Sequence, residues 1–525
     1  TSRGLGDVYK RQIYDRNGVI LADNQPVFTA VISPDEIDNP DNTLALLTPI
    51  FQLTPEEISE ASKALKKSKN EPVTIKIGLT EQQVAQFSER KPFFKGVTIQ
   101  SKLTRTYPYS DLFAHVIGYV GRISDNDSKK LDKKLYAGTD LIGKTGIEKY
   151  YESLLLGKPG YQSIETNAYG DIIKKLDTKP PIPGNDIYLS LDYGLQKLTS
   201  DLLNGKRGAA VAIDPNTGEI LAFVSNPSFD PNPFITGISS REYKALQQDP
   251  DMPLYNRALQ GQYPPGSSIK PIEGLAGIHY GIMGWDSSIY DPGYFSLPGD
   301  SHKFRDWKKS GHGNVNLHKS VVESVDTYYY KLSYQLGIDR LHDWMTRFNF
   351  GSKTGIDLPG EKTGVYPSTE WKMKTYKKAW LPGETISVSI GQGYFLATPL
   401  QIANGIAMLA SDGQHLTPHL LKKSTGAEHI TPIEKPDGKI QYNGNPNDWQ
   451  RMHLAMEDVV KKGTAHNIYT PTYRIAGKTG TAQVKSIAQG KRYNEAALDS
   501  RHWDHGWFVG LSLIHISEPT RRRGI

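Results

Sequence analysis

Tyr-Pro-Pro-Gly-Ser-Ser-Ile-Lys-Pro occupies residues 263–271 and decides how this chain of 525 residues is interpreted. Its Pro-Pro-Gly predicts a turn, and the apolar and glycine residues that follow predict a buried helix that Ser267 opens. Ser267 and Lys270 are three residues apart, a spacing that puts Cβ atoms about 5–6 Å apart on one helix face. A serine hydroxyl needs a neighbouring base, and a buried lysine with a lowered pKa supplies one. The stretch therefore predicts a nucleophile, Ser267, with Lys270 as its base.

A second copy of this spacing, at Ser88 and Lys91, lies in a different context. It sits in the charged run Ser-Glu-Arg-Lys ahead of a proline, near the end of a predicted amphipathic helix. Average composition gives Ser-x-x-Lys about once or twice by chance in a chain of this length. Because charged residues surround Ser88, we interpret that copy as solvated surface.

Both ends of the chain resemble translated sequencing adapter rather than protein. Asp-Val-Tyr-Lys-Arg-Gln at 7–12 is encoded by GATGTGTATAAGAGACAG, the end of a common transposase-based adapter. Residues 511–521 correspond to the same adapter read in reverse. We therefore predict that residues 1–12 and 511–525 are non-native, adapter-like segments and that the native protein is truncated at both ends.

Composition excludes several classes of protein. The formal net charge is +6, but each predicted adapter segment contributes +2, so the remaining body carries only +2. A nucleic-acid-binding function therefore loses its support. A hydrophobic content of 37% and a mean hydropathy of −0.50 indicate a soluble globular chain with room for more than one domain. The absence of cysteine excludes disulfides and thiolate metal sites.

A proline-rich run at 179–184 predicts a short, stiff linker between two domains. Before it, helices are predicted to begin after Thr54 and Thr80, and strands are predicted at 73–77 and 97–103. No acid, base and nucleophile converge in this part. We interpret it as a positioning or interaction domain.

After the linker, strands, helices and further strands follow one another, which predicts one sheet whose halves are separated in sequence. The predicted class is multidomain α+β. The elements expected are strands at 209–213 and 219–225, helices to about residue 345 and at 399–409, and strands at 473–484 and 507–509.

An acyl-transfer serine needs a second hydroxyl that carries a proton to the leaving group. Ser-x-Asp and Ser-x-Asn occur several times in the chain, and the pattern by itself has little value. Ser324 and Asp326 form the best copy, because they lie in the helical middle and follow Ser267.

The same chemistry needs a positive, donor-rich strand that holds a substrate carboxylate. Lys-Thr-Gly occurs four times, beginning at Lys144, Lys353, Lys362 and Lys478. The first precedes a predicted helix, and the next two flank a Pro-Gly turn. Only the last lies in a predicted strand, where glycines at 477 and 480 would let a substrate backbone approach. The predicted binding residues are Lys478, Thr479, Gly480 and Thr481.

These three motifs stand in the order found in penicillin-recognising acyl-serine enzymes. Within them, the chain resembles the class B penicillin-binding proteins, most closely the elongation-specific branch called penicillin-binding protein 2. The resemblance spans roughly residues 13–510. It includes Ile-Tyr-Asp-Arg-Asn-Gly at 13–18, His-Val-Ile-Gly-Tyr-Val at 115–120, Gly-Ile-Glu at 146–148, Asp-Pro-Gly at 291–293, Arg-Asp-Trp-Lys-Lys at 305–309, Gly-His-Gly at 311–313 and Ile-Gly-Gln-Gly at 390–393.

The resemblance implies a mixed α/β pedestal of the penicillin-binding protein dimerisation type at 13–180. It implies a transpeptidase domain at 184–510, with an antiparallel sheet flanked by helices as in β-lactamases. A single membrane helix in the bacterial inner membrane is expected ahead of the pedestal, with the catalytic domain in the periplasm. Family members continue past Gly510 with a final strand and a helix, so we expect the second domain to be C-terminally truncated.

The resemblance also implies a reaction. Ser267 is expected to attack the penultimate D-Ala carbonyl of a peptidoglycan stem peptide, and a neighbouring stem amine to complete the cross-link during cell elongation and rod-shape maintenance. β-Lactams are expected to trap the serine. The implied roles are Lys270 as base, Ser324 as proton relay positioned by Asp326, Lys478, Thr479 and Thr481 as carboxylate binders, and the backbone N–H groups of Ser267 and Thr481 as oxyanion hole.

Some elongation-type members carry zinc on two aspartates, a histidine and a cysteine. The matching positions here are Asp291, Asp306, His312 and Val325. Because valine replaces the thiolate, the set is incomplete for a closed four-ligand site. We expect no stable zinc and no other cofactor, with the three remaining residues held by hydrogen bonds and ion pairs.

The implied partners are peptidoglycan stem peptides, lipid-linked precursor strands, β-lactams, a polytopic glycosyltransferase and rod-complex proteins, but no nucleic acid. Two alternatives stay open. A D,D-carboxypeptidase or β-lactamase would pass the acyl group to water, and a non-catalytic penicillin sensor or scaffold would only signal or recruit.

Overall fold

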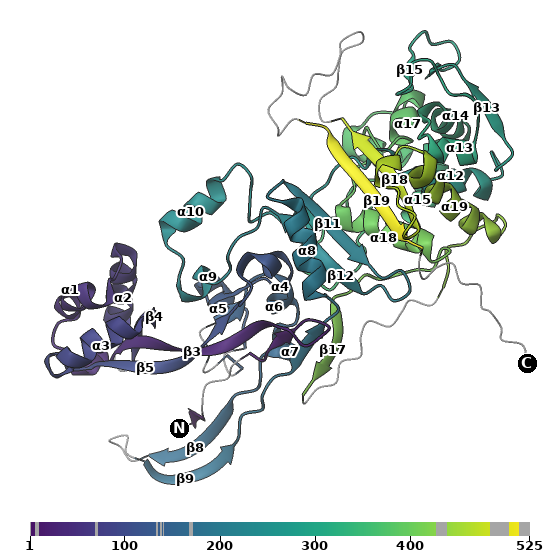
Figure 1. Ribbon diagram of the computed structural model, residues 1–525. Coiled ribbons are helices and arrows are strands. Elements are labelled where there is room, and N and C mark those ends of the chain that lie inside the picture. The colour runs from purple at the N-terminus through teal and green to yellow at the C-terminus, as the bar shows by residue number, and fades with distance from the viewer. Residues whose placement is uncertain are drawn as a thin grey trace, which may run out of the picture.

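The computed structural model describes residues 2–5, 10–68, 72–132, 135–136, 139, 141–166, 172–426, 438–483 and 503–513. Helices and sheets alternate along the chain, which confirms the predicted multidomain α+β class. The molecule is elongated, with the N-terminal helices at one end and a largely helical C-terminal region at the other (Figure 1).

The far end of the N-terminal region is a small α/β unit. The long strand β3 (Ile20–Ile32) pairs antiparallel with both β4 (Val73–Leu79) and β5 (Val97–Thr106). Its helices share an apolar core with these strands, and a capping box begins α2 as predicted. The helices are α1 (Pro40–Phe51), α2 (Pro55–Lys67) and α3 (Glu81–Arg90).

One sheet joins the two predicted domains. β2 (Ile13–Tyr14) pairs with β3 and, in parallel, with β10 (Asp186–Leu189), and β10 pairs with β17 (Leu421–Thr425) from the C-terminal region. The predicted linker is not a free spacer, because Lys158 and Ile182 exchange backbone hydrogen bonds of 2.7 and 2.9 Å. The boundaries predicted at 180 and 184 stay predictions, and the structure adds pairing between distant segments, which leaves no trace in local composition.

A residue just before the boundary predicted at Ile13 contributes to the fold. Lys10 is 7% exposed, and its Nζ lies 3.1 Å from Glu148 Oε2 and 2.7 Å from Glu152 Oε2. Arg105 Nε donates to Glu148 Oε1 at 2.6 Å. Burial raises the pKa of the Glu148 carboxyl, but Arg105 and Lys10 outweigh it, so the pKa lies below its usual value. Lys10 is thus part of this buried cluster, while residues 1 and 6–9 lie outside the described residues.

The remaining N-terminal elements are short and surround this cluster. β1 (Ser2–Leu5) pairs with β8 (Gly160–Thr166), and β8 pairs with β9 (Ile172–Lys179) in a hairpin that projects from the region (Figure 1). The others are α4 (Ala114–Ile117), β6 (Val120–Arg122), α5 (Asp125–Ser128), β7 (Leu141–Gly143), α6 (Gly146–Tyr150) and α7 (Glu152–Leu155).

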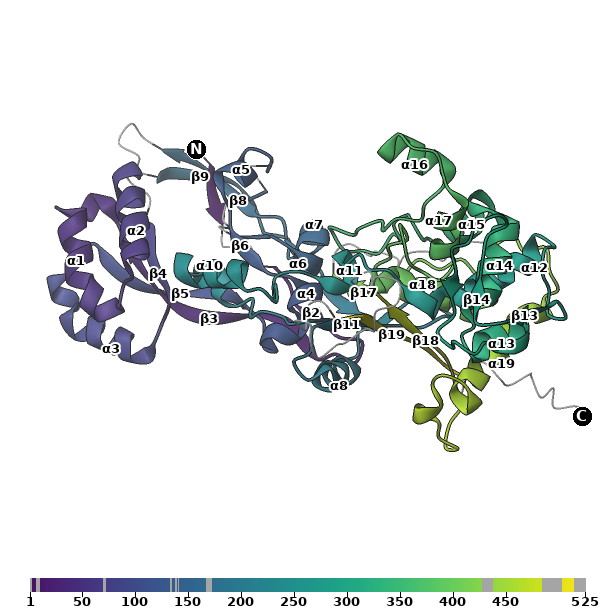
Figure 2. The ribbon, with the colours of Figure 1, turned by 90° about the horizontal axis from the view of Figure 1, so that it is seen from above.

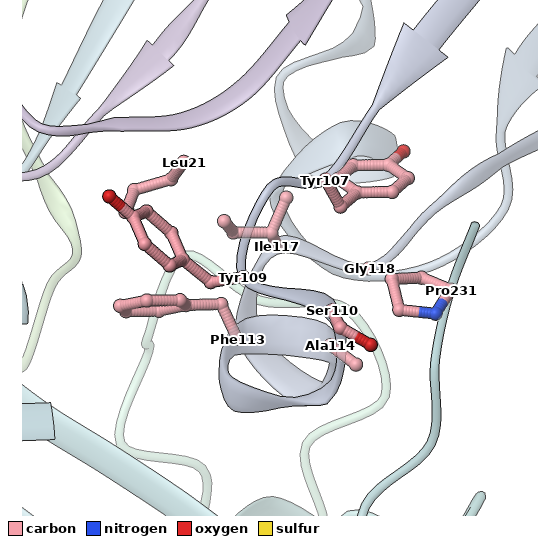
Figure 3. Close-up of a pocket in the computed structure, with 9 residues that line it drawn as sticks. All are labelled: Leu21, Tyr107, Tyr109, Ser110, Phe113, Ala114, Ile117, Gly118 and Pro231. Atoms are coloured by element: carbon pink, nitrogen blue, oxygen red, sulfur yellow. The ribbon is translucent and has the colours of Figure 1, made fainter. Parts of the chain in front are cut away.

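A small pocket lies where this region meets the loop that carries Pro231. Mostly apolar side chains line it, among them Leu21, Phe113 and Ile117 (Figure 3). None of the predicted acyl-transfer residues lines it. The pocket is therefore separate from the predicted active site.

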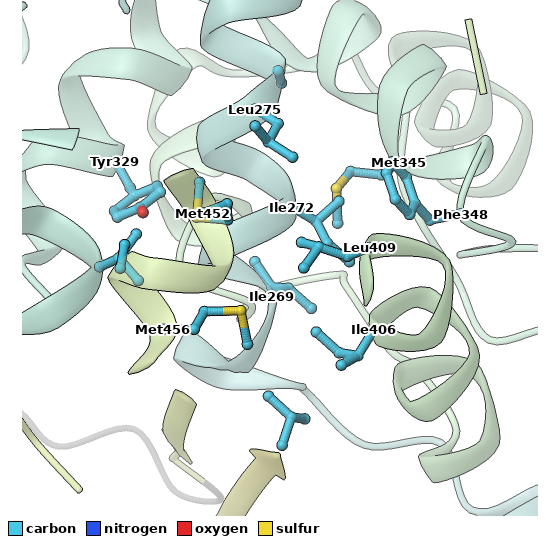
Figure 4. Packing of buried hydrophobic residues seen from close by; sticks show 14 of the residues in the cluster. Ile269, Ile272, Leu275, Tyr329, Met345, Phe348, Ile406, Leu409, Met452 and Met456 are labelled. Carbon is cyan, nitrogen blue, oxygen red and sulfur yellow. The ribbon is translucent and has the colours of Figure 1, made fainter. Parts of the chain in front are cut away.

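The C-terminal region is built around α12 (Lys270–His279), a helix that is buried along most of its length. Ile272 and Leu275 are fully buried, and side chains of neighbouring helices enclose them (Figure 4). Those helices are α14 (Asp326–Leu336), α15 (Ile338–Thr346), α18 (Pro399–Ala410) and α19 (Asn447–Lys462).

Other helices and short strands complete the C-terminal region. They are α8 (Tyr193–Leu203), α9 (Pro233–Thr236), α10 (Ser240–Gln248), α11 (Arg257–Gln260), β13 (Ser288–Asp291), β14 (Tyr294–Phe295), β15 (Phe304–Arg305), β16 (Gly313–Asn316), α13 (Leu317–Val322), α16 (Thr369–Tyr376) and α17 (Pro382–Val388).

Besides the short pairs β13–β16 and β14–β15, the C-terminal region contains two longer antiparallel pairs. β11 (Gly208–Ile213) pairs with β12 (Ile220–Asn226), and β18 (Ile475–Ala482) pairs with β19 (His505–Ser512). The sequence predicts one sheet, but within the described residues no strand pairing joins the two hairpins. Both hairpins instead contact α18, so a shared helix rather than a shared edge brings them together.

The boundary predicted at Gly510 falls inside β19. Leu511 and Leu513 are buried in the main core, and Ser512 pairs with Ile475. Residues 514–525 of the predicted tail, and Val484 of a predicted strand, lie outside the described residues. A search of the described residues for helices of membrane-spanning length and hydrophobicity found none.

Candidate active site

The nucleophile turn leads into the central helix of the C-terminal region. Gly266–Ile269 forms a 3-10 turn, and α12 continues from Lys270. Ser267 is partly exposed, whereas Lys270 is fully buried. The prediction that Ser267 opens a buried helix is confirmed.

The loop that carries Ser324 holds Lys270. Lys270 Nζ donates to the Ser324 carbonyl oxygen at 2.9 Å and to Asp326 Oδ1 at 2.7 Å, and it lies 3.4 Å from Ser324 Oγ. The ring centroid of Tyr329 lies 5.2 Å from the same nitrogen. Among the contacts of the described residues, no hydrogen bond joins Lys270 Nζ to Ser267 Oγ. Lys270 therefore lies on the buried side of the nucleophile turn, and the loop that carries Ser324 orients its side chain.

Ser324 connects two lysines that are far apart in the sequence. It lies between α13 and α14, and its φ of +55° is in the left-handed region, which is strained for a residue other than glycine. Its Oγ lies 2.8 Å from Lys478 Nζ as well as 3.4 Å from Lys270 Nζ. This arrangement gives a hydroxyl two nitrogen partners for proton exchange.

Lys478 points into the protein from β18. It is 0% exposed, and its Nζ also donates to the Thr479 carbonyl oxygen at 2.8 Å. Burial, and next the nearby Lys270 cation, lower the pKa of Lys478 well below its usual value, and Asp326 opposes this only in part. The Lys-Thr-Gly motif predicts that Lys478 presents positive charge to a substrate carboxylate. In the structure, its nitrogen contacts Ser324 Oγ, and its role toward a substrate carboxylate stays a prediction.

Asp326 contacts Lys270 rather than Ser324. Its Oδ1 accepts from Lys270 Nζ at 2.7 Å, and this pair is largely buried, with the Asp326 side chain 14% exposed. The expected role of Asp326 in positioning the Ser324 hydroxyl stays a prediction. In the structure, Asp326 begins α14, and its carboxylate contacts Lys270 on α12.

The β18 strand presents alternate residues to solvent. Thr479 is partly exposed and Thr481 is exposed, whereas Lys478 and Gly480 face inward. A methyl group added to Gly480 would lie 2.9 Å from the Ser268 backbone nitrogen, which is too close for any side chain. Gly480 has an internal role, since it lets β18 approach the nucleophile turn, and its expected role in admitting a substrate backbone stays a prediction.

A buried acid, Glu273, lies one helical turn after Lys270. Its Oε1 accepts from the Tyr366 hydroxyl at 3.4 Å, and Oε2 has no hydrogen-bond partner within the described structure. Burial raises the pKa of Glu273 well above its usual value, although Lys270 opposes this. Asp326, and not Glu273, is the carboxylate that pairs with Lys270.

The three predicted metal-position residues do come together. One ligand atom from each of Asp291, Asp306 and His312 lies within 4.8 Å of the others, and all three residues are buried. Each donor already has a partner. Asp291 accepts from backbone N–H groups, and His312 Nε2 lies 3.2 Å from Asp306 Oδ1. Val325, in the fourth position, offers no ligand atom, so these residues do not fit a closed zinc site.

Sequence reasoning missed Glu323. Its Oε2 lies 2.5 Å from His312 Nδ1, while His312 Nε2 contacts Asp306. Asp306 Oδ2 in turn accepts from the backbone N–H groups of Asp326 and Thr327 at 2.8 and 3.1 Å. The sequence signal that could have indicated Glu323 is its position as an acidic residue directly before Ser324. These contacts fix the loop that holds Lys270.

The other copies of the motifs lie away from this cluster. Ser88 is exposed on α3, and its Oγ donates to the Val84 carbonyl oxygen, which confirms a surface role. Lys144 precedes α6, and Lys353 and Lys362 lie outside helices and strands. Structure and sequence context therefore select the same copies.

Two family profiles match the chain. The profile described as "Penicillin binding protein transpeptidase domain" matches residues 208–512, and the profile described as "Penicillin-binding Protein dimerisation domain" matches residues 10–189. This chain belongs to the penicillin-binding proteins. Both profiles include residues that were predicted above to belong to adapter-like ends.

Curated penicillin-binding relatives cover most of the chain. The chain is 59% identical to the peptidoglycan D,D-transpeptidase MrdA of Acinetobacter baumannii over 95% of its own length and 75% of the relative. It is 43% identical to the protein of the same name in Escherichia coli K12, over 94% of the chain and 79% of the relative. These matches fit the class B, elongation-type branch.

Solved structures of penicillin-binding proteins share the fold. The Pseudomonas aeruginosa PBP2 in complex with WCK 5153 matches with a TM-score of 0.74 and 39% identity, over 97% of this chain and 89% of that one. The complex between PBP2 and MreC from Helicobacter pylori matches with a TM-score of 0.81 and 31% identity, over 97% and 92%. The two-domain architecture is therefore common to these proteins.

Proposed function

We propose that this chain is a peptidoglycan D,D-transpeptidase that works through an acyl-serine intermediate. The observation that carries the proposal is the buried contact of Ser324 Oγ with both Lys270 and Lys478, directly behind a partly exposed Ser267. The family to which the chain belongs supports the substrate, a stem peptide that ends in D-Ala-D-Ala.

In acylation, Ser267 Oγ attacks the carbonyl carbon of the penultimate D-Ala. Its proton passes to the Lys270 amine once that amine is neutral, and the proton reaches the departing D-Ala amine through Ser324. The C–N bond breaks and terminal D-Ala leaves. Backbone N–H groups of Ser267 and Thr481 are suited to the oxyanion, because Gly480 brings β18 against the nucleophile turn.

In the second half-reaction, an amine from a neighbouring stem attacks the acyl-serine. The same groups act in reverse, so that Ser267 regains its proton as the new amide forms. Before acylation, Thr479 and Thr481, which face solvent on β18, can hold the terminal carboxylate of the donor stem, and this carboxylate leaves with D-Ala. The contact of Lys478 Nζ with Ser324 Oγ suits a proton relay, and burial lowers the pKa of this lysine.

An assay of products tests this proposal. The protein is mixed with glycan strands that carry stem pentapeptides, and free D-Ala and cross-linked stems are both measured. A transpeptidase releases D-Ala and forms cross-links. Release of D-Ala alone would indicate a carboxypeptidase, and neither product, from protein that still binds penicillin, would indicate a sensor or scaffold.

The lowered pKa of Lys478 predicts a pH-dependent stability. An unfolded lysine takes up a proton near pH 10.4, whereas the folded Lys478 does so only at lower pH, so its burial costs more stability as the pH falls through this window. The thermal midpoint of Lys478→Met is expected to lie above that of the unaltered protein. This difference is expected to be larger at about pH 7 than at about pH 10.5.

Thermal unfolding across this range checks the expectation. Lys374→Met, on the exposed surface of α16, is the matched control and is expected to show no such trend. A Lys478→Met difference that is the same at every pH would mean that the folded lysine keeps its proton.

We further propose that the activity needs no resident metal. The protein is expected to hold no stoichiometric zinc after dialysis, because Val325 supplies no fourth ligand beside Asp291, Asp306 and His312. Val325→Cys is expected to create a tightly bound zinc, close to one ion per molecule. Elemental analysis of both proteins is the measurement. Stoichiometric zinc in the unaltered protein would contradict this proposal.

Location and partners are part of the same proposal. We infer that the native enzyme is anchored in the bacterial inner membrane, acts in the periplasm and works with a polytopic glycosyltransferase and rod-complex proteins. A similar structure, of PBP2 from Helicobacter pylori, is a complex with MreC, and another is of a peptidoglycan synthase complex that coordinates polymerization and crosslinking. Co-purification of the native protein with such partners tests this inference.

A further inference from the structure

Four aromatic side chains gather on one side of the C-terminal region, and the proposed chemistry does not use them. The ring centroid of Tyr394 lies 5.3 Å from Trp371, 5.4 Å from Tyr376 and 6.1 Å from Trp380. Trp371 and Tyr376 come from α16, Trp380 precedes α17, and Tyr394 follows it. We call these four residues the aromatic platform. α16 projects from the body of the region (Figure 2).

The hydrophobic core does not account for the platform. Of its four members, only Trp380 packs against the main core cluster of the described residues. Tyr376 is 48% exposed, and the neighbouring Met373 and Leu381 are 49% and 60% exposed. Exposed apolar surface with a polar rim is typical of a binding site.

The rim of the platform is cationic. Lys374, Lys377 and Lys378 are exposed, and no ion pair is found for them within the described residues. Lys372 lies beneath the rings, with its Nζ 5.6 Å from the Trp380 centroid and 5.9 Å from that of Tyr394, and pairs with Glu384. The surface is therefore suited to a ligand that carries negative charge.

The platform is fixed to the nucleophile turn through Gly391. The Gly391 carbonyl oxygen accepts from the Gly266 N–H at 2.9 Å, and any side chain at Gly391 would collide with the backbone of Gly266. Tyr394 follows three residues later, so at most about 11 Å of chain separates it from this contact. An extended stem pentapeptide spans at most about 18 Å. A glycan whose stem reaches Ser267 can therefore extend as far as the platform.

We propose that the aromatic platform binds the saccharide chain of the peptidoglycan strand whose stem occupies Ser267. The C–H bonds on the face of a pyranose ring carry partial positive charge, and the faces of aromatic rings are negative, so the two pack together. Stem carboxylates along the strand meet the lysines of the rim. This inference rests on the proposed function, because it names a further part of the same substrate.

Binding of peptide-free glycan strands tests the platform apart from the chemistry. Such strands are added to the unaltered protein, to a Trp371→Ala, Tyr376→Ala double variant and to a Tyr290→Ala control, whose tyrosine is 73% exposed elsewhere in the region. The double variant is expected to bind about tenfold more weakly, as for the loss of stacked aromatic rings in other polymer-binding sites. The control is expected to bind as the unaltered protein does.

Two further measurements keep the result decisive. In the unaltered protein, glycan is expected to shift the indole NMR signal of Trp371, a readout that needs no variant. Lys374→Gln, Lys377→Gln and Lys378→Gln together are expected to weaken binding of peptide-bearing strands while sparing peptide-free ones.

If the double variant and the control bind glycan equally well, the proposal is wrong, and the platform is then a binding site for a protein partner. Absence of glycan binding by unaltered protein that still reacts with penicillin would overturn it as well. If the unaltered protein does not react with penicillin at all, the result would instead count against the proposed function.

Discussion

Replacing Ser267 with alanine is expected to abolish covalent labelling by a fluorescent penicillin. No other oxygen in the cluster has the position of Ser267 Oγ, since Ser324 Oγ lies between two lysine nitrogens in a buried turn. Without that oxygen, the acyl–oxygen bond cannot form. Labelling is measured by gel fluorescence and by the mass of the intact protein.

The second serine of the turn provides a matched control. Ser268 is fully buried, and its Oγ donates to the Pro265 carbonyl oxygen at 2.8 Å, so it faces away from the substrate side. Ser268→Ala is expected to keep labelling, with some loss of stability. Labelling of Ser267→Ala at the same mass increment as the unaltered protein would overturn the assignment of the whole site.

Replacing Lys270 with methionine is expected to slow acylation by about 10²–10⁴-fold, the usual contribution of a general base. The variant is also expected to lose stability, because Asp326 then remains largely buried without its cation. The rate of penicillin acylation and the thermal midpoint are the two measurements.

A double variant separates the two roles of this pair. Asp326→Asn alone is expected to slow acylation, and Lys270→Met with Asp326→Asn is expected to be no slower than Lys270→Met, because Asp326 acts through Lys270. The double variant is also expected to regain part of the lost stability. Additive losses in rate would show that Asp326 has a role independent of Lys270. Lys197→Met, which removes an exposed ion pair with Asp201, is the surface control.

Local sequence was sufficient for much of the fold. The capping box at Thr54, the turn before Ser267 and the strand around Lys478 all depend on neighbouring residues, and the structure has each of them. Contacts between the predicted domains could not be predicted, because they join segments that are distant in sequence. β10 and β17 join the N-terminal sheet through hydrogen bonds between segments far apart in the chain, and Lys10 is buried only because Glu148 and Glu152 come to meet it.

The motifs and their sequence context determined, without the structure, which serine, lysines and aspartate form the candidate site. The context was sufficient because it separates copies in a buried helix or strand from copies on the solvated surface. Only the tertiary structure decided their pairing. Asp326 belongs to Lys270, Lys478 belongs to Ser324, and Glu323 supports His312. These contacts depend on side-chain directions where α12, β18 and the turn at Ser324 meet. A sequence specifies each element, but the angles between them arise only when they pack.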